Sequence, residues 1–188
     1  FYAYICFFNF ILKYNLRYVI INTKRKDQQK MRILVTSDSH GDYRRLEKTA
    51  EKATPFDAFI FLGDGEKDFD IVTRNMTGIN TYRVRGNNDY DSSVPMTNVI
   101  RIGSHSLLLT HGSNLSLWHG FDRLIEIANE NNCQAALFGH THSRHYSFEG
   151  GVHLFNPGSV SMPRDGKGRS YGIITEENGK LDFYHFDL

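Results

Sequence analysis

Residues 31–41, MRILVTSDSHG, contain the pattern that decides the fold: a short β-branched apolar run that stops at a cluster of polar side chains. Such a run predicts a buried strand. The same pattern recurs four times further along the chain. The predicted strands and their endings are residues 33–36 before Ser37-Asp38-Ser39-His40-Gly41, 58–62 before Gly63-Asp64-Gly65, 81–84 before Gly86-Asn87-Asn88-Asp89, 107–110 before His111-Gly112, and 135–138 before Gly139-His140-Thr141-His142.

Helical patterns separate several of these runs. Residues 42–53 place Leu46 and Ala50 on one face, and residues 117–131 repeat apolar side chains at helical spacing. Helices that alternate with strands predict a layered α/β domain. In such folds ligands gather beyond the carboxyl ends of the strands, so we expect the five polar endings to meet at one rim.

The pattern changes after residue 142, where the helical periodicity stops. Four further strands are predicted over residues 144–148, 152–155, 171–175 and 181–186, with Gly-rich turns between them. We expect these strands to form a second sheet packed against the first. No repeat or linker interrupts residues 31–188, which therefore predict one domain.

Residues 1–30 differ in composition from the rest of the chain. They contain eight Phe or Tyr and neither Gly nor Pro, and Lys13 and Arg17 interrupt the apolar run before the roughly 20 residues that a membrane span needs. Their residue types are those of A/T-rich codons. We interpret them as a non-native extension, read from upstream DNA, and predict that the native protein begins at Met31.

Charge and cysteine content indicate which partners and which cellular compartment to expect. The extension holds six Lys/Arg and one acidic residue, which leaves 16 Lys/Arg and 20 Asp/Glu, a balance of −4, for residues 31–188. No basic surface of the kind that binds nucleic acid is expected, and no membrane partner. Only Cys6 and Cys133 occur, so we expect no disulfide framework and a reducing, cytoplasmic location.

Each polar ending has an ordinary explanation when it is considered alone. The pair Asp38 and His40 is typical of a turn or a helix cap, and a lone His111 is more often a hydrogen-bonded structural residue. Together, however, the five endings supply seven oxygen and nitrogen ligands without a thiolate, more than one tetrahedral ion requires. The set favours two divalent cations. These seven residues are Asp38, His40, Asp64, Asn87, His111, His140 and His142.

The order Asp-x-His, Gly-Asp, Gly-Asn-x-Asp, His, Gly-His-x-His resembles that of the calcineurin-like metallophosphoesterases. The run 156–164, NPGSVSMPR, is similar to the signature of their small bacterial and archaeal phosphodiesterase subgroup. The resemblance covers residues 31–188. It implies an α/β fold of two packed mixed β-sheets flanked by α-helices.

The resemblance also assigns roles to the ligands. It implies that Asp38, His40 and His142 bind one cation, that Asn87, His111 and His140 bind the other, and that Asp64 bridges both. The expected cations are Mn²⁺ first, with Ni²⁺, Fe²⁺, Zn²⁺ or Co²⁺ as alternatives. Catalysis is expected at Asp64, Asn87, His111 and Asp89, through a hydroxide activated by the two metals.

Two positions depart from the family pattern. Many relatives have His where this chain has Asn88, and that His is proposed to protonate the leaving group with help from the acid that follows, here Asp89. Asn cannot act as an acid near neutral pH. Close relatives often carry a second His where this chain has Ser113. Both differences bear on the leaving group and the substrate, not on metal binding.

Hydrolysis of a small phosphodiester is therefore the expected function. A phosphomonoesterase and a non-catalytic scaffold, like the subunit of this fold in the eukaryotic retromer complex, remain the alternatives. The complete set of ligands argues against the scaffold, and the charge of −4 argues against a DNA nuclease. A homo-oligomer stays an open expectation.

Overall fold

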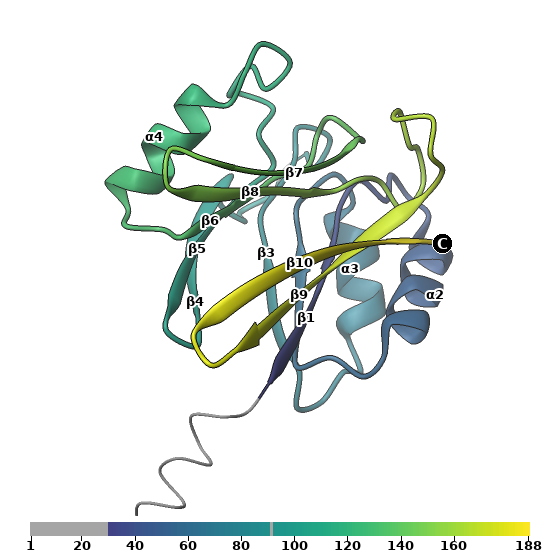
Figure 1. The fold of residues 1–188 in the computed structure, drawn as a ribbon. Helices are drawn as coiled ribbons and strands as arrows, with labels where there is room; N and C mark the ends of the chain where they lie inside the picture. The colour runs from purple at the N-terminus through teal and green to yellow at the C-terminus, as the bar shows by residue number, and fades with distance from the viewer. Residues whose placement is uncertain (1–29, 91) are drawn as a thin grey trace, which may run out of the picture. The chain divides into compact units, whose positions relative to one another are not determined.

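Two five-stranded sheets form the centre of the computed structural model, which describes residues 30–90 and 92–188 (Figure 1). The prediction for residues 1–30 falls on a segment that lies, except for Lys30, outside the described residues, and it stays a prediction. The first sheet has the order β10 (Lys180–Asp187), β9 (Ser170–Glu177), β1 (Met31–Thr36), β2 (Ala58–Phe61) and β3 (Asn80–Arg83). The second has the order β4 (Thr97–Ile102), β5 (His105–Thr110), β6 (Ala135–Leu137), β8 (Val152–Pro157) and β7 (Arg144–Glu149).

Both sheets are mixed. In the first, β1, β2 and β3 are parallel and β9 runs antiparallel to β1. In the second, β5, β6 and β8 are parallel, while β4 and β7 are antiparallel to their neighbours. The parallel strands bring the ends of consecutive chain segments to one edge of each sheet.

The core lies between the two sheets. Side chains alternate across a strand, so Ile33 and Val35 of β1 point into this layer, where they join Leu107 and Leu109 of β5. The intervening Leu34 points to the opposite face of the first sheet. All of these side chains are fully or almost fully buried, so burial of apolar surface holds the sheets together.

Helices cover the two outer faces. The helices α2 (Tyr43–Ala53) and α3 (Glu66–Thr73) pack on the first sheet, where Leu46 and Phe69 contact the cluster that contains Leu34. The helix α4 (Asp122–Glu130) packs on the second sheet through Leu124 and Ala128. Figure 1 shows these helices on opposite sides of the paired sheets. The predicted fold class, two packed mixed sheets flanked by helices, is confirmed.

The strands after residue 142 do not form a sheet of their own, and that prediction was wrong. The strands β7 and β8 extend the sheet of β5 and β6, whereas β9 and β10 extend the sheet of β1. Seven of the eight residues of β9 are buried, because this strand lies inside its sheet and is covered on both faces. The five strands that precede the polar endings are also divided between the two sheets: β1, β2 and β3 lie in the first, and β5 and β6 lie in the second.

The predicted helix over residues 117–131 begins later than expected. Residues 113–118 form turns, and α4 starts at Asp122. Ser116 has a φ of 52° and Gly120 a φ of 139°, values that a right-handed helix cannot include. Leu117 is nevertheless buried in the core beside α4, which explains why its spacing looked helical. By contrast, α2 lies where predicted, with Asp42 accepting a capping hydrogen bond from the Arg45 N–H at 3.1 Å.

Candidate metal centre

The five polar endings lie together at one edge of the paired sheets. Backbone hydrogen bonds join them to one another: Asp38 N–H donates to Gly63 C=O at 3.0 Å, and His40 N–H donates to Asp64 C=O at 2.9 Å. On the second sheet, Gly139 N–H donates to His111 C=O at 3.2 Å. The strand ends therefore hold the endings at fixed positions, as the sequence predicted for a shared rim.

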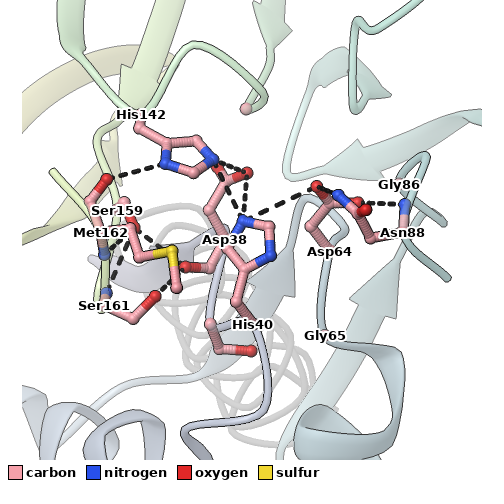
Figure 2. Close-up of polar contacts among 12 residues, drawn as sticks. Asp38, His40, Asp64, Gly65, Gly86, Asn88, His142, Ser159, Ser161 and Met162 are labelled. Atoms are coloured by element: carbon pink, nitrogen blue, oxygen red, sulfur yellow. Dashed lines mark hydrogen bonds and ion pairs between the residues drawn. The ribbon is translucent and has the colours of Figure 1, made fainter. Parts of the chain in front are cut away.

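Four of the predicted ligands form a tight group. The ligand atoms of Asp38, His40, Asp64 and His142 all lie within 4.8 Å of one another. His142 Nε2 is 3.1 Å from Asp38 Oδ1 and also 3.1 Å from His40 Nε2. His40 Nε2 lies 3.7 Å from Asp64 Oδ2 (Figure 2). We call these four residues the first cluster.

The remaining three predicted ligands lie on the other side of Asp64. His111 Nε2 is 3.4 Å from Asp64 Oδ2 and 3.2 Å from Asn87 Oδ1. The His140 ring stands edge-on to the His111 ring, with 5.2 Å between their centroids. We call Asn87, His111 and His140 the second cluster. Asp64 is thus in contact with both clusters.

Two of the histidines are held in one tautomer by backbone carbonyls. His111 Nδ1 lies 2.7 Å from Leu62 C=O, and His142 Nδ1 lies 2.7 Å from Met162 C=O. A carbonyl only accepts, so both Nδ1 atoms carry the proton and donate it. In the neutral rings, the Nε2 lone pairs then face the carboxylates. This is the orientation of a histidine that ligates a metal through Nε2.

Asp38 provides the test of whether a cation fits. The residue is fully buried, and neither of its carboxylate oxygens has a hydrogen-bond partner among the described residues. A buried carboxylate without compensation costs several kcal/mol, in the order of magnitude of an unpaired buried ion. The oxygens instead face the imidazole nitrogens of His40 and His142, and in the neutral ring of His142 the nitrogen Nε2 carries a lone pair. Convergent lone pairs on a buried anion fit a cation.

The titration behaviour reflects the same arrangement. Burial acts to lower the pKa of His142, but the Asp38 carboxylate outweighs it and raises that pKa above the ordinary value. His111 follows the same pattern, since Asp64 and Asp38 outweigh its burial and raise its pKa. Burial acts to raise the pKa of Asp64, but the charge of a protonated His111 and the hydrogen bonds from Asn88 hold it well below its usual range. Positive charge is therefore favoured at the centre.

His140 differs from the other two rings. Burial lowers its pKa, and the neighbouring His111 lowers it further. The ring is thus disposed to stay neutral, which leaves it with a lone pair for a ligand.

The Asp89 carboxylate accepts hydrogen bonds from the backbone. Its two oxygens accept four hydrogen bonds, from the N–H groups of Asp64, Gly65, Glu66 and Gly86, at 2.8 to 2.9 Å. These donors belong to two of the five endings and to the start of α3. The structure thus places Asp89 as the acceptor that ties the endings of β2 and β3 together, whereas the sequence suggested a role beside a proton donor.

Asn88 is bonded to Asp64. Its backbone N–H donates to Asp64 Oδ1 at 2.8 Å, and its side-chain amide donates to Asp64 Oδ2 at 2.6 Å (Figure 2). Gly86 makes this approach possible, because a Cβ atom there would lie 2.0 Å from Asp64 Oδ1. Asn88 therefore orients the carboxylate that touches both clusters.

Residues 156–164 form hydrogen bonds to two of the segments that carry candidate ligands. The hydroxyl groups of Ser159 and Ser161 both donate to Asp38 C=O, at 2.9 and 2.7 Å (Figure 2). The Asn156 amide donates to Gly139 C=O at 2.9 Å and to Thr141 Oγ1 at 3.1 Å, on either side of His140. The sequence marked this run as a family signature but assigned it no role. In the structure, its hydrogen bonds hold the segments that carry Asp38 and His140 in place.

Two open clefts meet at His40. One, of about 610 Å³, runs past Asn88 to the exposed ring of Tyr90. The other, of about 470 Å³, runs past Arg44. His40 and Gly41 line both clefts. Both clefts therefore reach the candidate centre at His40.

Comparisons with known proteins agree with this geometry. The family described as the calcineurin-like phosphoesterase superfamily domain matches residues 31–179. The "probable metallophosphoesterase YsnB" of Bacillus subtilis is 30% identical over 159 residues, which are 84% of this chain and 91% of that protein. The "phosphodiesterase YfcE" of Escherichia coli is 26% identical over 165 residues, covering 78% of this chain and 89% of that protein.

A solved structure gives the same result. A Streptococcus pneumoniae protein described as a predicted phosphoesterase has a TM-score of 0.74 at 27% identity, covering 85% of this chain and 90% of its own. The chain belongs to the calcineurin-like phosphoesterase superfamily. The resemblance inferred from the sequence is confirmed, and the family is one of metal-dependent phosphoester hydrolases. Within residues 30–90 and 92–188, no helix is long and apolar enough to cross a bilayer.

Proposed function

We propose that this chain hydrolyses phosphodiesters at a centre of two divalent cations. One cation is held by the first cluster, with Asp38, His40 and His142 as its own ligands. The other is held by the second cluster, Asn87, His111 and His140. Asp64 is the shared ligand, because it contacts both clusters at distances of 3.4 to 3.7 Å.

The observation that carries this proposal is the buried carboxylate of Asp38, which has no hydrogen-bond partner within residues 30–90 and 92–188 and faces two imidazole rings. The oxygen and nitrogen donors suit Mn²⁺ and related cations, and we propose Mn²⁺ first. The chemistry that such cations supply when bound is polarisation of a phosphoryl oxygen and a lower pKa for water. The proposed compartment is a reducing cytoplasm.

Other residues of the chain hold the proposed ligands in the orientation that the cations need. Leu62 and Met162 carbonyls fix the rings of His111 and His142, so that both Nε2 atoms point to the centre. Asn88 fixes both oxygens of Asp64. Groups held in advance in this way cost little reorganisation when a phosphate arrives.

A diester is proposed as the substrate because two clefts meet at His40. A phosphate at the centre would have room for an ester group on each side. The relative named as phosphodiesterase YfcE supports the same choice. Asn88 supports it further, since its amide cannot protonate a poor leaving group.

The test is metal-dependent hydrolysis of bis(p-nitrophenyl) phosphate. Protein freed of metal with a chelator is expected to be inactive, and added Mn²⁺ is expected to restore turnover. Equal activity without metal would contradict the two-cation centre. Binding of two Mn²⁺ without hydrolysis of any ester would favour a scaffold, and faster hydrolysis of p-nitrophenyl phosphate would favour a monoesterase.

A further inference from the structure

Asp68 is a buried carboxylate that lies behind the first cluster. It stands in the first turn of α3 and is only 5% exposed. One of its oxygens, Oδ2, accepts two hydrogen bonds, from Ser39 Oγ at 2.6 Å and from Gly41 N–H at 2.9 Å. These donors are the residues immediately before and after His40. Asp68 therefore holds the residues on both sides of a candidate ligand, Ser39 through its side chain and Gly41 through its backbone.

His40 needs this support more than His111 and His142 do. The rings of His111 and His142 are fixed by carbonyl groups at their Nδ1 atoms. Among the described residues, no carbonyl accepts a corresponding bond from His40, whose side chain is 17% exposed. Its backbone also has a φ of 47°, in the left-handed region that non-glycine residues rarely occupy. The position of His40 is thus set through its backbone.

The contact is closely packed. A Cβ atom at Gly65 would lie 1.9 Å from Ser39 Oγ and 3.0 Å from Asp68 Oδ2, so only glycine leaves room for this pair. Gly65 follows Asp64 directly. Close packing at this contact therefore joins the start of α3 to the segments that follow β1 and β2.

We propose that Asp68 is a positioning residue for His40 and sets the cation affinity of the first cluster. The inference rests on the proposed function, because it concerns the same cations. Asp68 acts through its hydrogen bonds with the two neighbours of His40, the Ser39 hydroxyl and the Gly41 N–H, and it makes no bond of its own to a cation. Removal of those bonds leaves the second cluster intact.

The experiment is a Mn²⁺ titration of metal-free protein, with free Mn²⁺ measured by electron paramagnetic resonance. The wild-type chain is expected to bind two ions. Asp68→Ala is expected to weaken one site by about 10- to 100-fold, the usual effect of losing a group that orients a ligand, and to leave the other site unchanged. Asp68→Asn keeps an oxygen at the same place and is expected to recover most of the affinity.

The matched control is Asp70→Asn. Asp70 stands on the same helix and carries the same charge, but it is 52% exposed and pairs with Arg83. This variant is expected to bind both ions like the wild type. If Asp68→Asn weakens binding as much as Asp68→Ala does, the charge of Asp68 acts directly on the cation and the positioning proposal is wrong.

Thermal unfolding of the metal-free variants separates positioning from general damage. Equal weakening of both sites, in step with a lower melting temperature, would overturn the proposal. Should Asp68→Ala fail to fold, Ser39→Ala removes one of the two bonds from the other end, and unchanged affinity in that variant would overturn the proposal equally. A wild-type chain that binds no Mn²⁺ would overturn the proposed function too, whereas two normal sites in Asp68→Ala would overturn the role of Asp68 alone.

Discussion

Five of the seven candidate ligands have a left-handed backbone. Asp38, His40, Asp64, His140 and His142 have φ values between 47° and 65°, and only three other non-glycine residues in the described part of the chain have a positive φ. Each such residue costs of the order of 1–3 kcal/mol. Nothing in the two sheets requires this conformation. It directs the side chains to one point, which is what a metal centre needs.

Asp64→Asn is the sharpest single-residue test of that centre. The change removes a negative charge that both clusters share, so we expect the occupancy of both cations to fall. Turnover of bis(p-nitrophenyl) phosphate should drop by more than about 100-fold, beyond the range for residues that only orient a ligand. Metal content and steady-state rates are the measurements.

The control for Asp64→Asn is Asp182→Asn, which makes the same charge change in a partly exposed residue that pairs with Lys180. It should leave metal content and rate unchanged. A variant Asp64→Asn that retained two cations and a near-normal rate would show that Asp64 is not the shared ligand.

Asn88→His tests the leaving-group preference. The natural amide cannot donate a proton near neutral pH, whereas an imidazole with an ordinary pKa of about 6.5 can. We expect the wild-type chain to prefer diesters with good leaving groups, and Asn88→His to raise the rate on p-nitrophenyl phosphate relative to the diester. The ratio of kcat/KM for the two substrates is the measurement.

Asn88→Ala is the companion variant, because it removes the side-chain hydrogen bond to Asp64 Oδ2 without adding an acid. It should weaken metal binding and leave the substrate ratio unchanged. If Asn88→Ala shifts the ratio as far as Asn88→His does, the effect comes from the loss of the amide and not from a new proton donor.

At the scale of the elements, the sequence predicted the strands that carry a strong local signal. The runs before Asp38, Asp64 and His111 are apolar and buried on both faces, so their composition identifies them. The strand β4 was not predicted, since only Ile100 and Ile102 among its residues are buried. The helix α3 was missed for a similar reason, because Phe69 is its only fully buried apolar residue.

The sequence also predicted some parts of the candidate site and not others. That the candidate ligands lie close together could be predicted, because each follows a strand whose pattern is visible in the sequence. The supporting residues could not, because they act across long separations: Ser161 bonds to Asp38, and Asn156 bonds to the segment that carries His140. The sheet to which a C-terminal strand belongs is likewise decided by packing of the whole chain, and no local pattern records it.

The start of α3 offers a prediction at this scale. Asp89→Asn keeps one oxygen but loses the other and the charge, which leaves two or more of four backbone N–H groups poorly bonded. The free energy of unfolding should fall by about 1–3 kcal/mol. Metal affinity should fall with it, because the endings of β2 and β3 loosen. Urea unfolding of the metal-free protein is the measurement.

Asp42→Asn serves as the comparison for Asp89→Asn, since Asp42 caps α2 with a single backbone bond, from Arg45. Its loss of stability should be smaller. A variant Asp89→Asn with wild-type stability and a changed preference between monoesters and diesters would show that Asp89 takes part in proton transfer after all.

At the scale of the whole molecule, the centre lies where the two sheets meet. Asp38, Asp64 and Asn87 follow strands of the first sheet, whereas His111 and His140 follow strands of the second. The sheets are joined by their apolar core and, at this edge, by hydrogen bonds such as the one from His111 Nδ1 to Leu62 C=O. Cations held by both sets of ligands would therefore add a polar link between the sheets at one edge.

Metal binding should accordingly stabilise the entire domain. A cation at 100 times its Kd adds about 2.7 kcal/mol to the free energy of unfolding, and each kcal/mol raises the Tm of a chain of this size by about 2–4 °C. We expect Mn²⁺ to raise the Tm of metal-free protein by about 5–11 °C, measured by calorimetry. Asp38→Asn should lose much of this gain, because it weakens the cluster that ties β1 to the ending of β6. An equal gain in the variant, or none in a wild-type chain shown to bind Mn²⁺, would mean that the cations do not join the two sheets.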